Sequence, residues 1–314
     1  MSTGTVAEAP VVVPSEGAGS LVGRLRGWAS NPWGKPRFLT AFTWLYVAWS
    51  LVPVVIAVLF SFNAGRSRSA WQGFSLQWYT GDPDLAIIND PSMRSALVQS
   101  VKLAVLTMLI STPLGIALAI GLGRWRGRAS KPANFLMLLP LVTPELIMGV
   151  ALLLVFVHMI PFIDLGTGAQ LLGHVTFTLS FVVIVARGRL FAIGKEYEEA
   201  AMDLGASPMQ ALWHVLLPLL RPAILVGALV AVAISLDDFV ISQFLVGDAG
   251  TNTIPVRVYS ASRLGPTPAT NAIATVLLFS TLLTATAAGL ILRRARRREH
   301  REGSAVEDLA RLEI

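Results

Sequence analysis

The hydrophobic positions of this chain fall into six long runs separated by short polar segments. The runs cover residues 40–62, 97–122, 133–158, 171–192, 222–246 and 271–292. A helix needs about 20 mostly apolar residues to cross the hydrocarbon core of a bilayer, and each run is about that long. Because lipid cannot satisfy exposed backbone N–H and C=O groups, we expect each run to be a helix. The pattern predicts an all-α membrane protein, a bundle of six transmembrane helices, in which prolines 53, 113, 140 and 144 suggest kinks or breaks.

The polar segment between the fourth and fifth runs has a pattern of its own, EEAAMDLGASPMQALWHVLLP (198–218). Glutamates at its start favour the positive end of a helix dipole. Gly205 suits the left-handed conformation that closes a helix. Ser207 suits the N-cap of a second helix, with Pro208 at its first position. The segment therefore predicts a pair of short helices over residues 196–218.

The second of these helices is amphipathic. Met209, Leu212, Trp213 and Leu216 follow the i, i+3, i+4, i+7 spacing that forms one apolar stripe, and Pro218 ends the pattern. Such a helix can lie flat on the membrane, pack on its own bundle, or insert into a groove of another protein. The periodicity alone leaves these three alternatives open.

Composition supports a membrane protein and removes several kinds of chemistry. Hydrophobic residues make up 54% of the 314 residues, charged residues only 14%, and the mean hydropathy is +0.64. Soluble domains usually carry about 25% charged residues. The chain has no cysteine, which excludes disulfides, thiolate metal sites and cysteine nucleophiles. Its four histidines lack the clustered spacing of metal ligands, so we expect no metal site.

The distribution of lysine and arginine sets the expected orientation. With both termini inside, nineteen of the 25 basic residues lie in inner segments and five in outer segments, with Lys102 in a span. This excess is the positive-inside pattern. We therefore expect a disordered cytoplasmic tail at 1–38, a membrane domain at 39–295, and a basic cytoplasmic tail at 296–314 that meets anionic lipid rather than nucleic acid.

Acidic residues inside the apolar runs are costly and therefore usually functional. Asp237 and Asp238 are expected in the middle of the fifth run, about 100° apart around the helix, so that they cannot point the same way. Glu145 follows Pro144 where the third run is expected to break. These three acids either line a pathway for a cation, or cap broken helices, or pair with the partner subunit. His174 is interpreted as a hydrogen-bonded interfacial residue rather than a ligand.

The 196–218 segment also carries a fixed motif. Its residues are Glu199, Ala200, Ala201, Gly205, Val215, Leu217 and Pro218. This resembles the E-A-A-x3-G-x9-I-x-L-P signature of membrane permease subunits of binding-protein-dependent ABC importers, with valine in place of isoleucine. The resemblance implies a coupling helix pair that docks into a cleft of an ATPase subunit. In that docking, Glu199 would make polar contacts, Gly205 would set the helix angle, and Leu212, Trp213 and Leu216 would fill the groove.

Less specific stretches narrow the resemblance to the second permease of spermidine/putrescine importers. They are WQGFSLQWY (71–79), Thr143-Pro144-Glu145, the stretch 235–240 and the stretch 254–260 with Asn271-Ala272. Trp71, Trp78 and Tyr79 in the first stretch are typical of rings at the headgroup level. The resemblance implies import of a polyamine cation in a bacterial inner membrane. Opine, amino-phosphonate and ferric iron permeases share parts of these stretches, so those cargoes remain alternatives.

The chain lacks the means to hydrolyse ATP itself. It contains no G-x-x-x-x-G-K-[ST] phosphate loop and no G-x-S-x-G elbow, so we expect a non-enzymatic subunit without a cofactor of its own. ATP and Mg²⁺ would bind a pair of separate ATPase subunits. A homologous permease and a soluble or lipid-anchored solute-binding protein would complete the importer. The remaining alternative is an ATP-independent secondary transporter.

Overall fold

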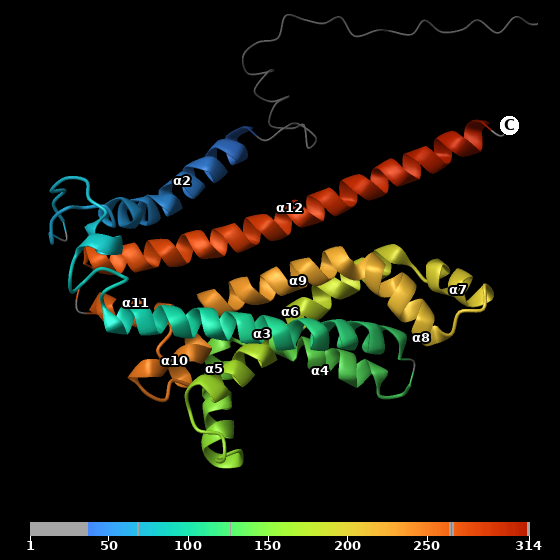
Figure 1. Cartoon of the computed structure of the whole chain (residues 1–314), viewed down its shortest axis with the longest axis horizontal. Coiled ribbons are helices and arrows are strands. Elements are labelled where there is room, and N and C mark those ends of the chain that lie inside the picture. Colours follow the sequence, from blue (N-terminus) through green and yellow to red (C-terminus); the bar gives the residue numbers. More distant parts are fainter. Residues whose placement is uncertain (1–36, 68, 126, 264, 266, 313–314) are drawn as a thin grey trace, which may run out of the picture. The chain divides into compact units, whose positions relative to one another are not determined.

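The computed structural model describes residues 37–67, 69–125, 127–263, 265 and 267–312, and the regular structure in these ranges is helical (Figure 1). The helices are α2 (Arg37–Phe60), α3 (Pro91–Arg124), α4 (Ser130–Val142), α5 (Glu145–Leu154), α6 (Thr167–Ile193), α7 (Glu196–Asp203), α8 (Pro208–Ala211), α9 (Leu217–Asp237), α10 (Val240–Phe244), α11 (Ile254–Arg263) and α12 (Pro268–Leu312). The all-α prediction is confirmed, whereas the tail predicted at 1–38 lies almost wholly outside the described residues. The chain divides into two units, Met1–Val54 and Val55–Ile314, and the second contains all helices from α3 to α12.

Five of the described helices are long and apolar enough to cross a membrane. They are Phe38–Phe60, Pro91–Arg124, Thr167–Ile193, Pro208–Asp237 and Pro268–Arg294. A sixth span requires α4 and α5 to count as one, although the chain bends by 108° between them. The break falls at Thr143 and Pro144, because a residue that precedes proline is disfavoured in the α conformation and proline has no N–H to donate. The predicted break at Pro144 is thus confirmed, whereas α2, α3 and α4 continue past their own prolines.

The core of the second unit lies where α3, α6 and α9 pack together. Val182 of α6 is fully buried between two glycines. A Cβ on Gly115 of α3 would lie 2.6 Å from Val182 Cγ1, and one on Gly227 of α9 would lie 3.3 Å from it. Small residues of this kind allow membrane helices to approach closely, which supplies packing where the hydrophobic effect is weak.

The loop between α2 and α3 folds around a tryptophan. Trp78 is 1% exposed, its indole N–H donates to the Asn63 carbonyl at 2.6 Å, and it packs on Met93 and Ile273. The expectation that Trp78 anchors at the headgroup level is therefore wrong, because its ring and its donor are both satisfied inside the fold. Trp71 in the same loop is half-exposed.

The last helix extends beyond its apolar part. The part of α12 that is apolar enough to cross a membrane ends at Arg294, but the backbone stays helical to Leu312. The boundary expected at 295–296 therefore separates apolar from basic composition within one helix, rather than two structural pieces.

Candidate functional site

The 196–218 segment begins with the predicted pair of helices. After α7, Gly205 has a φ of +92°, a conformation that glycine adopts readily. Ser207 then caps α8: its Oγ accepts from the Gln210 N–H at 3.3 Å, and its own N–H donates to Gln210 Oε1 at 2.8 Å. The predicted turn at Gly205 and the predicted cap at Ser207 are both confirmed.

The second helix does not end at Pro218, contrary to the prediction. A π-helical turn (Leu212–Leu216) follows α8, and the Leu217 N–H donates to the Leu212 carbonyl. Pro218 stands directly after this turn, where the hydrogen-bond register changes and its missing N–H is tolerated. The chain therefore continues as one 30-residue helix from Pro208 to Asp237, and the fifth span includes the second helix of the 196–218 segment.

The apolar stripe of that helix faces two environments. Met209 and Trp213 are 61% and 62% exposed, whereas Leu216 is 0% exposed and packs on Ile193 and Leu220. The expectation that Leu216 fills a groove of a partner is therefore corrected, because its side chain is already enclosed by its own chain. Leu212 is half-buried against the same cluster. The exposed part of the stripe is what remains for a partner.

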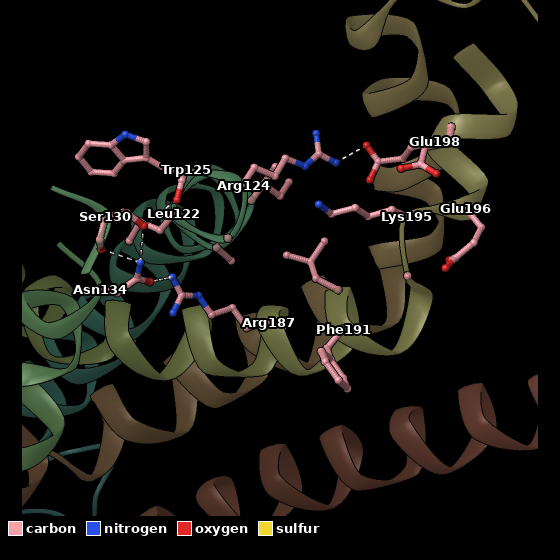
Figure 2. A pocket seen from close by; sticks show the side chains of 16 residues that line it. Leu122, Arg124, Trp125, Ser130, Asn134, Arg187, Phe191, Lys195, Glu196 and Glu198 are labelled. Atoms are coloured by element: carbon pink, nitrogen blue, oxygen red, sulfur yellow. Dashed lines mark hydrogen bonds and ion pairs between the residues drawn. The ribbon is translucent and has the colours of Figure 1, made fainter. Parts of the chain in front are cut away.

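A cavity of about 860 Å³ lies beside the start of α7 (Figure 2). Glu198 of α7 forms an ion pair there with Arg124, the last residue of α3. Arg187 of α6 donates a hydrogen bond to Asn134 of α4 in the same cavity. Glu199 lines the cavity but is exposed, as is Ala200, while Ala201 is half-buried. The ion pair ties α7 to α3.

The structure brings the three predicted acids to one place, although not in the middle of a helix. Asp237 is the last residue of α9, and the backbone is extended at Asp238 before the chain resumes a helix as α10. Asp237 is exposed and Asp238 is buried, so they face different ways as predicted. Glu145 begins α5 after the break at Pro144, and its ionisable neighbours are Asp238, Asp237 and His174.

His174 of α6 is fully enclosed at this break. Its Nδ1 lies 2.7 Å from Ser235 Oγ, and its Nε2 lies 2.9 Å from Ser242 Oγ and 3.1 Å from Asp238 Oδ2. The Ser242 N–H donates to the same Asp238 oxygen at 2.8 Å. The interpretation of His174 as a bonded interfacial residue is confirmed. Among the described residues, no group of three or more His, Asp or Glu side chains is arranged to hold a metal ion.

Sequence reasoning missed the polar neighbours of His174 along α6. Gln170 and Thr178 lie one turn before it and one turn after it, and both are buried. Gln170 accepts from Gln99 of α3 at 2.8 Å, and Thr178 lies 2.8 Å from Ser111 of α3. Polar residues spaced by four within an otherwise apolar run mark one helix face. The spacing of Gln170, His174 and Thr178 could therefore have predicted a buried polar face on this helix.

Comparison with known proteins gives the family. The family of the binding-protein-dependent transport system inner membrane component matches residues 111–300, which include the 196–218 segment and the three acids. This chain belongs to that family. As an inner membrane component it is a multi-pass transport subunit rather than an enzyme.

Curated relatives of this inner membrane component cover most of both chains. It is 36% identical over 277 residues to the putrescine transport system permease protein PotI of Escherichia coli (strain K12), which is 87% of this chain and 95% of that one. It is 35% identical over 254 residues to the spermidine/putrescine permease protein PotC of Haemophilus influenzae, covering 81% and 96%. The molybdenum transport system permease protein ModB of Mycobacterium bovis is 32% identical over 226 residues, covering 67% and 82%.

Solved structures give the same fold. A chain of a bacterial ABC transporter that imports the acidic polysaccharide alginate matches with a TM-score of 0.63 and 16% identity, covering 87% of this inner membrane component and 96% of that chain. A chain of a bacterial alginate ABC transporter in complex with its alginate pentasaccharide-bound periplasmic protein matches with a TM-score of 0.60 and 18% identity. At these identities the likeness concerns the fold of an ABC importer permease and not the cargo.

Proposed function

We propose that this chain is a permease subunit of an ATP-driven importer that carries putrescine or spermidine inward across a bacterial inner membrane. The observation that carries the proposal is the 36% identity to a putrescine permease over 277 residues. A homologous permease would complete the pathway, a solute-binding protein would deliver the cargo from outside, and two ATPase subunits would hold ATP and Mg²⁺. Both termini would lie in the cytoplasm, as the lysine and arginine distribution predicts.

The 196–218 segment would couple the ATPase to the membrane helices. Glu199 is exposed beside the cavity, and Met209 and Trp213 present apolar surface that a helix-in-groove contact could cover. Gly205 fixes the angle between α7 and α8 through a positive φ. Leu216 anchors the segment to its own chain, so that movement of the exposed part is passed to α9 rather than lost in a loose hinge.

The acids at the break between α9 and α10 suit a cationic cargo. Asp237 is exposed on this subunit, and a carboxylate at membrane depth costs about 2.5–3.5 kcal/mol in lipid. We therefore assign Asp237 to a water-filled pathway or to the partner permease rather than to the bilayer. An amine charged at neutral pH would meet Asp237 and Glu145 there through charge-assisted hydrogen bonds.

The test is ATP-dependent uptake by the complete complex in proteoliposomes. Labelled putrescine or spermidine should accumulate only with ATP, and a proton or sodium gradient alone should not drive uptake. Gly205→Pro should abolish cargo-stimulated ATP hydrolysis, because proline cannot adopt a positive φ, whereas Gly205→Asn should retain it. Full stimulation in the Gly205→Pro complex would refute the coupling role.

A second candidate keeps the machinery and changes the cargo. The 32% identity to a molybdenum permease favours it, because the same scaffold serves a chemically different solute. Binding of putrescine, spermidine, an opine, an amino-phosphonate and ferric iron to the cognate solute-binding protein distinguishes these cargoes. Tight binding of one of the last three, without polyamine binding, would replace the polyamine assignment.

A further inference from the structure

A single helix joins the 196–218 segment to the acids. The helix Pro208–Asp237 has 30 residues, and at 1.5 Å per residue it is about 45 Å long. Figure 1 shows α8 at one end of α9 and α10 at the other. Trp213 is exposed near the first end, and Asp237 closes the second end. A displacement at one end of such a rod is carried to the other unless the rod bends.

His174 of α6 holds the far end of this helix. No other histidine of the described residues makes such a contact. One ring nitrogen lies 2.7 Å from Ser235, inside α9, and the other lies 3.1 Å from Asp238, just beyond it. Ser242 of α10 completes the contact at 2.9 Å. His174 thus touches both sides of the break, and we call these four residues the His174 clasp.

The short helix after the break is held closely on two sides. A Cβ on Gly173 of α6 would lie 2.7 Å from Ile241 Cγ2, and one on Gly149 of α5 would lie 2.7 Å from Phe244 Cδ2. The contacts leave α10 little freedom to move relative to α5 and α6. The hydrogen bonds of the His174 clasp therefore decide how the end of α9 is oriented against this fixed block.

The clasp also determines which acid is available. Asp238 Oδ2 is occupied by His174 and by the Ser242 N–H. Asp237 stands about 100° further back around the helix and is exposed. Rotation of the end of α9 would exchange the directions in which the Asp237 and Asp238 side chains point. The contacts of His174 with Ser235 and Asp238 oppose that rotation.

We propose that His174 is a positioning residue for transport: it locks the end of the Pro208–Asp237 helix so that Asp237 faces the pathway and follows movement of the 196–218 segment. The inference rests on the proposed function, since it assigns His174 to the step in which ATPase movement reaches the cargo. It also predicts that Asp237, and not Asp238, is the acid of this pair that contacts a cationic cargo.

The test compares His174→Ala with His174→Gln in the reconstituted complex. Alanine removes both contacts, while the glutamine amide can still reach Asp238 and Ser242. Thr176→Ala is the matched control, because Thr176 is exposed two residues further along α6. For each complex, uptake of labelled putrescine and ATP hydrolysis are measured together, which gives the number of ATP molecules consumed per cargo molecule.

His174→Ala should lower uptake per assembled complex about tenfold or more, because the hydrogen bonds that hold Ser235, Asp238 and Ser242 to α6 are lost together. ATP hydrolysis should continue, so that the ATP consumed per cargo rises by a similar factor. His174→Gln should recover part of the loss, and Thr176→Ala should match the unmodified complex. Asp237→Asn should raise the KM for putrescine more than Asp238→Asn does.

A purely structural role would give a different result. The yield of assembled His174→Ala complex would fall, but uptake per complex and ATP per cargo would stay unchanged, and this outcome would overturn the inference. If the unmodified complex imports neither putrescine nor spermidine, the cargo assignment fails instead. The role of His174 is then tested with solute-binding protein that is purified with its own ligand bound. The inference would be overturned if the His174→Ala and unmodified complexes showed equal stimulation of ATP hydrolysis and equal release of that ligand into the vesicles.

Discussion

Replacing Leu216 by alanine tests the buried face of the 196–218 segment independently of its exposed face. The side chain is fully buried between Ile193 and Leu220, so its removal leaves a cavity. Buried leucine-to-alanine changes cost about 2–5 kcal/mol in folded proteins. Part of this cost is transfer from water, which is smaller when the unfolded helix stays in lipid or detergent. We therefore expect a loss near the lower end, about 2–3 kcal/mol.

Trp213→Ala is the matched substitution, three residues earlier on the exposed face of the same helix. Its side chain is 62% exposed, so the stability of the isolated permease should change by about 0.5 kcal/mol or less. Unfolding in detergent by increasing sodium dodecyl sulfate, followed by far-ultraviolet circular dichroism, measures both variants. A pull-down of the purified ATPase measures the exposed face, and Trp213→Ala should weaken it.

An exchange of behaviour between the two variants would contradict the assignment of Leu216 to the enclosed face and Trp213 to the exposed face. A Leu216→Ala permease that unfolds normally but no longer binds the ATPase would mean that Leu216 faces the partner during function. Equal losses of stability in both variants would mean that the exposed part of the stripe also packs inside the chain.

Three further outcomes are expected. Gly173→Ala should cost about 1–3 kcal/mol of stability, because its methyl group would collide with α10. Gly121→Ala should cost nothing in packing, because no neighbouring atom lies within 4 Å of a Cβ there. Unfolding in detergent tests both variants. Ser207→Ala should lower helix stability by about 1 kcal/mol, and Ser207→Asp should retain the cap; hydrogen exchange of the α8 amides measures this. The Leu85 backbone N–H, more than any other group, holds the pKa of Asp82 below its usual range. The loop between α2 and α3 should therefore keep this stabilisation above the ordinary pKa and lose it as pH falls through the lowered one. Asp82→Asn should remove this pH dependence from the protection factors of the loop amides, that is, from their exchange rates after division by the intrinsic rates at each pH.

Local sequence signals predicted several features because they depend on the chain's own covalent structure. Proline lacks an N–H, so the break before Glu145 could be read directly from Pro144. Glycine tolerates a positive φ, so the turn at Gly205 could be predicted, and the Ser207 cap followed from its hydroxyl. The six apolar runs predicted the helical class, since lipid imposes the same requirement on every backbone.

Other predictions were wrong where the preceding turn or a distant part of the chain changed the local outcome. Pro218 is a helix terminator by composition, yet the π-helical turn before it absorbs the missing donor. The fifth run is continuously apolar in sequence except for its acids, yet the helix ends at Asp237, and His174 and the Ser242 N–H hold Asp238 Oδ2 where the backbone is extended.

The pattern of apolar and polar positions was enough to predict a helical membrane protein with a helix, a glycine turn and a capped second helix between its fourth and fifth apolar runs. The packing of the helices settles what the pattern leaves open: Leu216 of the apolar stripe is enclosed, Asp238 rather than Asp237 is buried, and His174 of α6 contacts Asp238. The physical reason is that periodicity identifies a helix face, while its exposure depends on which other helix packs against it.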